Sequence, residues 1–203
     1  MEKMLKKISR GIVIVVLNIG LRTIFRMKVI GKKNIPKSGA LIFCGNHKSY
    51  MDPPAIAVTT GRKMGFMAKE ELKKNPLFAF LGWAFECIFV KWDSKDIAPL
   101  KQALKKLKSG ECLGIFPEGT RNGMEKNNGE LKNGAAYLAL KTGAQIIPVG
   151  IIGNGKAFTK NAIVYGKPID MTQYKDKKVD KELEERLSNE MKEEIIKLTL
   201  TLA

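Results

Sequence analysis

The single histidine of the chain, His47, lies five positions before a carboxylate, Asp52, in the run NHKSYMD at residues 46–52. A carboxylate can accept the Nδ1 proton of an imidazole, which fixes the tautomer and leaves Nε2 free to take a proton from a hydroxyl. Residues five apart do not share one face of a helix, so this contact requires the chain to fold back between them. With that contact His47 can act as a general base oriented by Asp52, but a single His near an Asp is, taken alone, more often a loop or capping residue than a catalyst. The alternative is an ordinary loop histidine followed by an aspartate that caps a helix, since one carboxylate cannot fill both roles without compromise.

A second polar loop follows an apolar run, in the sequence IFPEGTRN at residues 115–122. Gly119 allows a close approach of backbone to a ligand, and the guanidinium of Arg121 presents a fixed fork of donors suited to a phosphate. Alone, these residues are also typical of a solvated polar turn. The loop therefore predicts a ligand site only in combination with other functional residues.

Strands must position both loops, and the sequence has an apolar run before each of them. Residues 40–44 have the length and apolarity of a buried strand that ends just before His47. Asp52 and the two prolines after it predict a helix that begins there and ends near residue 60. Further strands are expected at 63–67, 87–90, 112–116, 145–152 and 162–165, and further helices at 76–85, 97–108, 134–141 and 180–198. This alternation predicts an α/β fold, a single domain with a mixed sheet flanked by helices, in which chemistry gathers in loops beyond the strand ends.

The two loops taken together, NHxSxxD at 46–52 and FPEGTR at 116–121, resemble the 1-acyl-sn-glycerol-3-phosphate acyltransferase family, also called lysophosphatidate acyltransferases. The resemblance extends to AKEEL at 68–72 and IIPVG at 146–150, so it covers roughly residues 30 to 170 in the expected order. It implies a glycerol-phosphate acyltransferase-like fold. It also implies transfer of a fatty acyl group from a thioester, acyl-CoA or acyl carrier protein, to the 2-hydroxyl of lysophosphatidate. The product would be phosphatidic acid, a step of phospholipid biosynthesis.

The resemblance also implies roles for individual residues. His47 removes the hydroxyl proton and Asp52 orients it, with no covalent acyl-enzyme, no metal and no cofactor other than the thioester co-substrate. A thioester is already activated, so the catalyst needs a base, a positioned hydroxyl and an oxyanion donor, for which backbone amides near His47 are candidates. Glu118 and Gly119 would hold the glycerol moiety, while Arg121 and Lys69 neutralise the phosphate. The residues expected to bind substrate are Lys69, Glu118, Gly119, Thr120 and Arg121.

One position departs from the family pattern. The family often has an arginine at the end of the strand near residues 89–92, and Trp92 aligns with it here. The acceptor could therefore differ, with another lysolipid or glycerol-phosphate as the alternative.

The amino-terminal segment has the run IVIVVLNIGL at residues 12–21, with cations before and after it. Ten apolar residues are too few to span a bilayer, which takes about 20. On a helical projection, an apolar stripe lies opposite a polar face. The apolar stripe consists of Leu5, Ile8, Ile12, Val16 and Ile19. The polar face consists of Lys3, Lys7, Arg10, Asn18 and Arg22. The pattern predicts a helix lying in the membrane interface, with residues 1–28 as a membrane-interface segment and 29–203 as the acyltransferase domain. A helix packed on its own domain is the alternative, and a cleaved signal peptide is disfavoured because residues 22–28 offer no small-residue cleavage site.

The chain carries 36 Lys and Arg against 20 Asp and Glu, a net charge of +16. This excess attracts polyanions, either an anionic phospholipid membrane or nucleic acid. Nucleic acid is disfavoured because aromatic residues are sparse and because the lysines of the segment 101–108 fit one solvated helix face, namely Lys101, Lys105, Lys106 and Lys108. We expect a peripheral or monotopic protein at the cytoplasmic face of the cell membrane.

Two further sequence patterns give less information about function. Residues 150–156 match the GxxxxGK part of a phosphate loop, but Ala157 stands where Ser or Thr would reach magnesium, so the match is attributed to chance. Three cysteines, an odd number far apart, predict buried reduced thiols in a cytosolic protein and no metal site; they are Cys44, Cys87 and Cys112.

Overall fold

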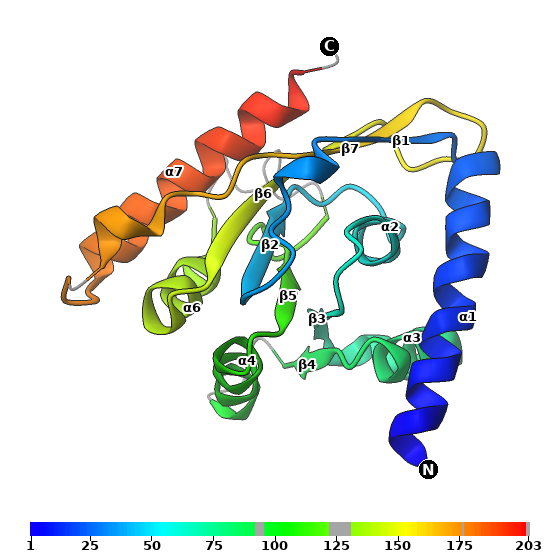
Figure 1. The fold of residues 1–203 in the computed structure, drawn as a ribbon, viewed down its shortest axis with the longest axis horizontal. Helices are drawn as coiled ribbons and strands as arrows, with labels where there is room; N and C mark the ends of the chain where they lie inside the picture. The colour runs from blue at the N-terminus through cyan, green and yellow to red at the C-terminus, as the bar shows by residue number, and fades with distance from the viewer. Residues whose placement is uncertain (92–95, 122–130, 176, 202–203) are drawn as a thin grey trace.

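A seven-stranded sheet runs through the centre of the computed structural model, which describes residues 1–91, 96–121, 131–175 and 177–201 (Figure 1). Within these residues the strand order is β1-β7-β6-β2-β5-β3-β4. The strands are β1 Met27–Ile30, β2 Leu41–Gly45, β3 Met64–Lys69, β4 Ile88–Val90, β5 Cys112–Ile115, β6 Gln145–Ile152 and β7 Asn161–Tyr165. All neighbours are parallel except β6 and β7, which are antiparallel, so the sheet is mixed.

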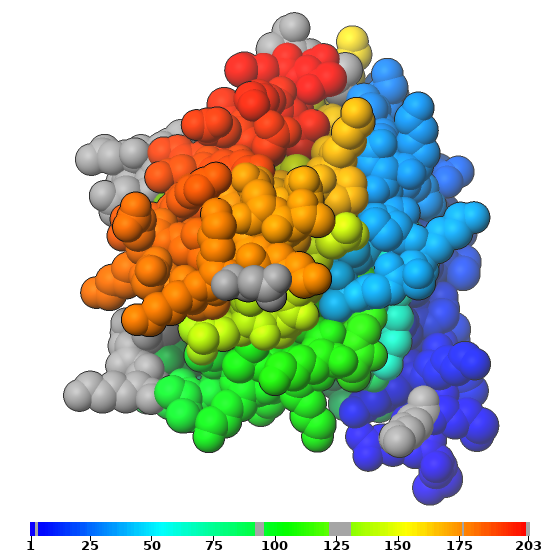
Figure 2. Space-filling view, turned by 60° about the vertical axis from the view of Figure 1, so that its left-hand side comes forward, coloured from blue at the N-terminus to red at the C-terminus, as the bar shows by residue number. Residues whose placement is uncertain are grey.

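Helices cover both faces of the sheet. They are α1 Glu2–Thr23, α2 Asp52–Thr59, α3 Pro76–Ala84, α4 Ala98–Lys108, α6 Gly134–Thr142 and α7 Lys181–Thr199, with 3-10 turns at Lys32–Asn34, Glu70–Lys74 and Met171–Tyr174. One face packs against α4, α6 and α7, and Figure 2 shows α4 and α7 covering that side of the molecule. The other face packs against α1, α2 and α3. The predicted fold, an α/β domain with a mixed sheet flanked by helices, is confirmed.

The central strand β2 explains why both faces are buried. Leu41 and Phe43 point to the core that α2 closes, while Ile42 and Cys44 point to the core that α6 and α7 close. Successive side chains of a strand point to opposite faces, so a strand buried on both faces is apolar at every position. This is the origin of the continuous apolar run that predicted the strand.

The strands and helices predicted from the sequence are present within a few residues of their predicted bounds, and one strand was missed. The missed strand, β1, is a four-residue edge strand with Lys28 in it, and pairing with β7 creates it. A segment of four residues is too short to show a clear hydrophobic pattern, so its pairing with β7 determines its conformation. The division predicted at residue 28 falls inside β1 and stays a prediction.

Helix α1 has two apolar faces. Val13, Ile14, Leu17 and Leu21 pack on the domain, where α1 contacts α2 and α3. The predicted stripe lies on the other side, and its residues together with Val15 are 49% to 62% exposed. The predicted stripe is exposed, and the opposite side of the same helix packs on its own domain as the alternative expected; the membrane-interface role of the stripe stays a prediction. In the described part of the chain, no helix has the length and apolarity needed to cross a membrane.

Candidate active site

The loop 46–52 joins β2 to α2, and its first residue ties it to the sheet. The Asn46 side chain is buried; its amide nitrogen donates to the Ile151 carbonyl oxygen at 2.9 Å, and its oxygen accepts from the Ile151 backbone N–H at 2.6 Å. The side chain thus continues the pairing of β2 with β6 beyond the end of β2. Asn46 was part of the motif without an assigned role, and the structure gives it one.

The chain folds back between His47 and Asp52, as the predicted contact requires. His47 Nδ1 lies 2.8 Å from Asp52 Oδ2, and the same oxygen accepts the backbone N–H groups of Lys48 and Ser49 at 2.7 Å each. Asp52 is 4% exposed and is the first residue of α2, whose N-cap is Met51. The predicted capping role of Asp52 is therefore wrong, and its carboxylate is committed to the loop.

These contacts define the proton positions. A carboxylate can only accept hydrogen bonds, so the Nδ1 of His47 carries the proton toward Asp52 and Nε2 has its lone pair available. The imidazole also stacks on Phe116, with ring centroids 4.1 Å apart and an interplanar angle of 22°. The ring is thus held both at its edge and on its face, and Nε2 can act as a base toward a hydroxyl.

Glu118 joins the second loop to the first. Its carboxylate oxygen Oε1 accepts the backbone N–H of His47 at 3.0 Å, and the residue is 2% exposed. The family resemblance implies a role in holding glycerol, and that role stays a prediction. The backbone amides of His47, Lys48 and Ser49, three candidates for the oxyanion donor, are all engaged by Glu118 or Asp52.

The rest of the second loop turns sharply. Gly119 has φ +69°, and a Cβ there would lie 2.8 Å from Lys132 Cε, so a glycine suits this position. Arg121 lies over the ring of Tyr50, with Cζ 3.7 Å from the ring centroid. Tyr50 in turn stacks on Phe78 of α3, with ring centroids 5.3 Å apart. Tyr50 was not selected from the sequence because stacking between loops leaves no spacing signal.

A pocket of about 220 Å³ opens beside the imidazole. Five of the predicted site residues line it, namely His47, Lys69, Gly119, Thr120 and Arg121. Asp52 and Glu118 lie behind His47, buried and away from this lining. The remaining wall is mostly apolar and comes from α2, α3, β3 and β4, with Phe66, Phe78, Leu81, Phe85 and Phe89 among its residues. The pocket therefore combines a histidine and two cations with an apolar wall.

Trp92, the departure from the family pattern, lies outside the described residues. The preceding strand β4 ends at Val90, so Lys91 lies outside the strand. In the described part of the chain, Lys69 and Arg121 are the cations among the pocket residues.

The cysteines are free thiols, and only two of them are buried as expected. Cys44 and Cys112 are buried in the core, whereas Cys87 is partly buried and lines the pocket. Burial raises the pKa of all three thiols above their ordinary value. Cys87 is therefore a thiol near neutral pH, which argues against a thiolate nucleophile in the pocket.

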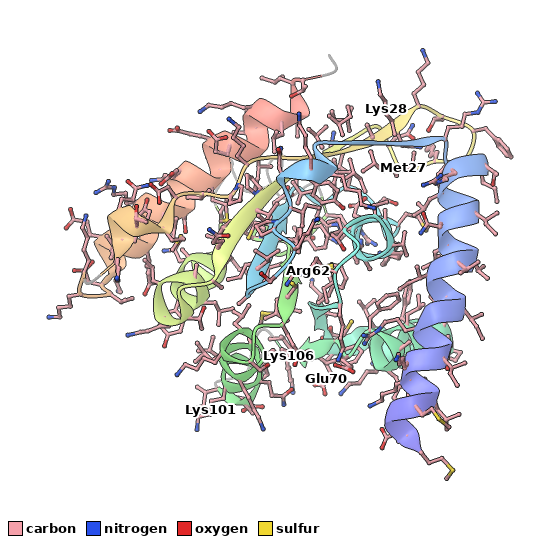
Figure 3. All side chains as sticks on the ribbon, in the orientation of Figure 1. Met27, Lys28, Arg62, Glu70, Lys101 and Lys106 are labelled. Atoms are coloured by element: carbon pink, nitrogen blue, oxygen red, sulfur yellow. The ribbon has the colours of Figure 1, made fainter. Side chains whose placement is uncertain are left out.

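The lysines of α4 do not all belong to one solvated face. Lys101 is exposed, but Lys106 is partly buried and bonds to Glu86 at 3.1 Å and Glu111 at 3.0 Å (Figure 3). The prediction of a fully solvated lysine face is wrong for Lys106, because Glu86 and Glu111 lie beside it.

Known proteins share this fold and these motifs. The model of the family described as Acyltransferase matches residues 26–152. The 1-acyl-sn-glycerol-3-phosphate acyltransferase of Borreliella burgdorferi is 36% identical over 137 residues, which are 66% of this chain and 54% of that protein. The protein of that name from Bacillus subtilis is 27% identical over 154 residues, which are 73% of this chain and 76% of that protein. The crystal structure of the 1-acyl-sn-glycerophosphate acyltransferase PlsC from Thermotoga maritima matches 100% of this chain and 85% of that chain, with a TM-score of 0.72 and 26% identity.

A pocket lined by a histidine just after a strand end, in a mixed α/β sheet, thus coincides with a family match over more than half of the chain. The chain belongs to the acyltransferase family. The resemblance to 1-acyl-sn-glycerol-3-phosphate acyltransferases, drawn from the two motifs, is confirmed by relatives and by a solved structure that carry this name. The chain spans about half the length of the first of these relatives, 54% for Borreliella burgdorferi and 50% for a probable enzyme of Mycoplasma pneumoniae.

Proposed function

We propose that this protein transfers a fatty acyl group from a thioester to the 2-hydroxyl of 1-acyl-glycerol-3-phosphate, giving phosphatidic acid. The observation that carries the proposal is the His47–Asp52 pair at the mouth of a pocket with cations and an apolar wall. The names of the similar enzymes support the choice of acceptor. Acyl-CoA and acyl carrier protein both present the required thioester, so either is a suitable donor.

The proposed mechanism is direct transfer. His47 Nε2 takes the proton of the acceptor hydroxyl while its oxygen attacks the thioester carbonyl, forming a tetrahedral intermediate. The carbon–sulfur bond then breaks, and the leaving thiolate takes the proton from the imidazolium. Asp52 stabilises the imidazolium through Nδ1. Both proton transfers pass through His47, and this scheme uses no metal and no cofactor.

Substrate binding divides between the two ends of the pocket. Lys69 and Arg121 would neutralise the phosphate, while Glu118 and Gly119 would hold the glycerol, with Thr120 as a further substrate-binding residue. The apolar wall, with Phe66 and the α3 side chains, would hold an acyl chain. An acyltransferase that uses another lysolipid or a glycerol-phosphate acceptor is the alternative.

The exposed stripe of α1 supports a location at an anionic phospholipid membrane, on its cytoplasmic face, with the protein peripheral or monotopic. The stripe offers apolar area to the lipid, and the cations that flank it attract anionic headgroups, each worth about 1 kcal/mol near the surface. This membrane partner is proposed in place of nucleic acid. Co-sedimentation with anionic vesicles, compared with a gel shift on random DNA at physiological salt, separates the two.

The decisive experiment incubates the protein with radiolabelled acyl-CoA or acyl carrier protein and a panel of lysolipid and glycerol-phosphate acceptors, followed by identification of the products. We expect labelled phosphatidic acid from lysophosphatidate and little product from a neutral monoacylglycerol. Faster acylation of another acceptor would reassign the substrate, and no transfer from either donor to any acceptor would refute the proposal.

A further inference from the structure

Phe158 is exposed on the loop between β6 and β7, at the end of α1. It is 68% exposed, and its backbone N–H donates to the carbonyl oxygen of Ile24, the residue that follows α1, at 2.7 Å. Ile24 is itself 42% exposed. Figure 1 shows this loop, in yellow, beside the carboxyl end of α1 at the edge of the molecule. A second group of exposed apolar side chains thus adjoins the helix that carries the stripe.

Hydrogen bonds of the Asn161 side chain hold the loop in place. Asn161 Oδ1 accepts the backbone N–H of Gly155 at 2.9 Å, and its Nδ2 donates to the carbonyl oxygens of Phe25 at 2.9 Å and Lys156 at 3.1 Å. Phe158 has φ +59°, a conformation that bulky residues rarely adopt. Such a conformation persists only where its surroundings enforce it. Here the enforced conformation leaves an aromatic ring outside the core.

The charged residues of the two segments that meet at Phe158 have one sign. Exposed cations flank it in sequence on both connected segments, namely Arg22 in the last turn of α1, Arg26 and Lys28 after α1, and Lys156 and Lys160 in the loop. Figure 3 shows Lys28 at the same edge of the molecule. The sequence has neither Asp nor Glu in residues 3–51 or in residues 151–169. An exposed aromatic ring surrounded by cations complements an anionic lipid surface, where rings enter below the headgroups and cations meet phosphates.

We infer that the loop 153–160, through Phe158, is a second bilayer-contact element that acts together with α1. This inference rests on the proposed location at an anionic membrane. The loop also touches the site, because a Cβ on Gly155 would lie 2.5 Å from Ser49 Cβ in the loop of His47. Lipid contact at Phe158 therefore sets the distance between the bilayer surface and the loop that carries the base. A lipid acceptor would then reach His47 without leaving the membrane surface entirely.

The test measures binding of the full chain to vesicles of phosphatidylcholine with phosphatidylglycerol, for the wild type and for Phe158→Ser. We expect binding about tenfold weaker, the lower end of what burial of a phenylalanine side chain contributes. Phe158→Leu should keep most of the affinity. The matched control is Ile97→Ser, because Ile97 is 58% exposed and precedes α4, which packs on the face of the sheet opposite to the one that α1 covers.

A second measurement reports insertion directly. Phe158→Trp should add fluorescence that shifts to the blue with vesicles and is quenched by brominated lipids, relative to the wild type with its two native tryptophans. Wild-type binding with an unchanged affinity for Phe158→Ser would overturn the inference and leave the proposed membrane location intact. No binding by the wild type would overturn both. If Phe158→Ser lost self-association while its vesicle binding stayed unchanged, the ring would belong to a contact between two molecules of this protein. That result would also overturn the inference.

Discussion

His47 is held at three points, by Asp52 at Nδ1, by Phe116 on the ring face and by Glu118 at the backbone N–H. We expect His47→Ala to lower the rate of acyl transfer by roughly 10²–10⁴-fold, because the chain has no second histidine to replace the base. Vesicle binding and the thermal unfolding midpoint should change little, since the imidazole is partly exposed. A variant that keeps more than about a tenth of the wild-type turnover would exclude His47 as the base.

Tyr50 is expected to position Arg121 for the phosphate. The guanidinium lies over its ring, and a cation–π contact contributes about 0.5–2 kcal/mol. Tyr50→Leu should therefore raise KM for lysophosphatidate by about fivefold with kcat nearly unchanged, whereas Tyr50→Phe should behave as the wild type. The measurement is initial rate against acceptor concentration in mixed micelles. A neutral monoacylglycerol serves as control, and an equal rise in its KM would show that Tyr50 acts on the pocket as a whole.

Sequence analysis identified the site residues whose role depends on residue type and local spacing. It did not identify contacts between residues that lie far apart in the sequence. His47 and Asp52 were found because their types and spacing allow a base with its orienting carboxylate. The contact of Glu118 with the His47 amide joins residues 71 positions apart, and no local pattern reports it. For the same reason Asn46 had no assigned role, since its partner Ile151 lies 105 positions away.

At the scale of elements, the β6–β7 loop and the loop of His47 are in close contact. Gly155→Ala is expected to lower kcat by about tenfold, because its Cβ would meet Ser49 at 2.5 Å and a displacement of about 1 Å near a catalytic group can cost up to 10²-fold. Steady-state kinetics with a saturating acceptor would measure the effect. Gly39→Ala is the matched control, since Gly39 has φ +82° but has no neighbour within 4 Å of an added Cβ. Similar losses of kcat in both variants would attribute the effect to backbone strain alone.

Elements with strong periodicity were predicted, whereas those created by pairing were not. The helix α7 and the strand β6 carry apolar patterns long enough to identify, and their bounds agree within a residue or two. The strand β1 has four residues and exists because it pairs with β7. Helix α1 was predicted by its exposed stripe, but its docking depends on Arg10, whose Nε donates to the Ala84 carbonyl oxygen at 3.0 Å.

At the scale of the whole molecule, a network of charges joins α1 to the sheet. Glu86 contacts Arg10 at 3.4 Å, Lys63 at 3.3 Å and Lys106 at 3.1 Å, and Lys106 also contacts Glu111. Burial alone would raise the pKa of Glu86, but the ammonium groups of Lys106 and Lys63 outweigh it and hold this pKa below its ordinary value. A lowered pKa in the folded state contributes stability above the unfolded-state pKa, and this contribution is lost as the pH falls through the folded-state value.

Glu86→Gln should therefore lower the free energy of unfolding by about 1–2 kcal/mol at pH 7, between the effects known for exposed and buried pairs. The difference from the wild type should shrink as the pH falls below the ordinary glutamate pKa of about 4.3 and through the lowered folded-state value, where the wild-type carboxylate is also protonated. Urea unfolding of both proteins at pH 7 and at a pH below the folded-state pKa of Glu86 measures this difference. Glu70→Gln is the control, because within the described part of the chain Glu70 forms an ion pair with Lys73 at the surface, where both side chains are 50% exposed. A difference that persists unchanged at low pH would show that charge is not the cause.

The pairing of β1 with β7 sets the order in which the protein can be completed during synthesis. Met27 pairs with Asn161, so the edge of the sheet next to α1 cannot close until the ribosome has released the residues between them. At roughly 5–20 residues per second this interval is on the order of 10 s. During this interval the stripe of α1 has already emerged from the ribosome, while β1 still lacks its partner strand β7. Attachment of the nascent chain to lipid can therefore precede closure of the sheet, and the last strand pairing can take place on a chain already tethered by its first helix.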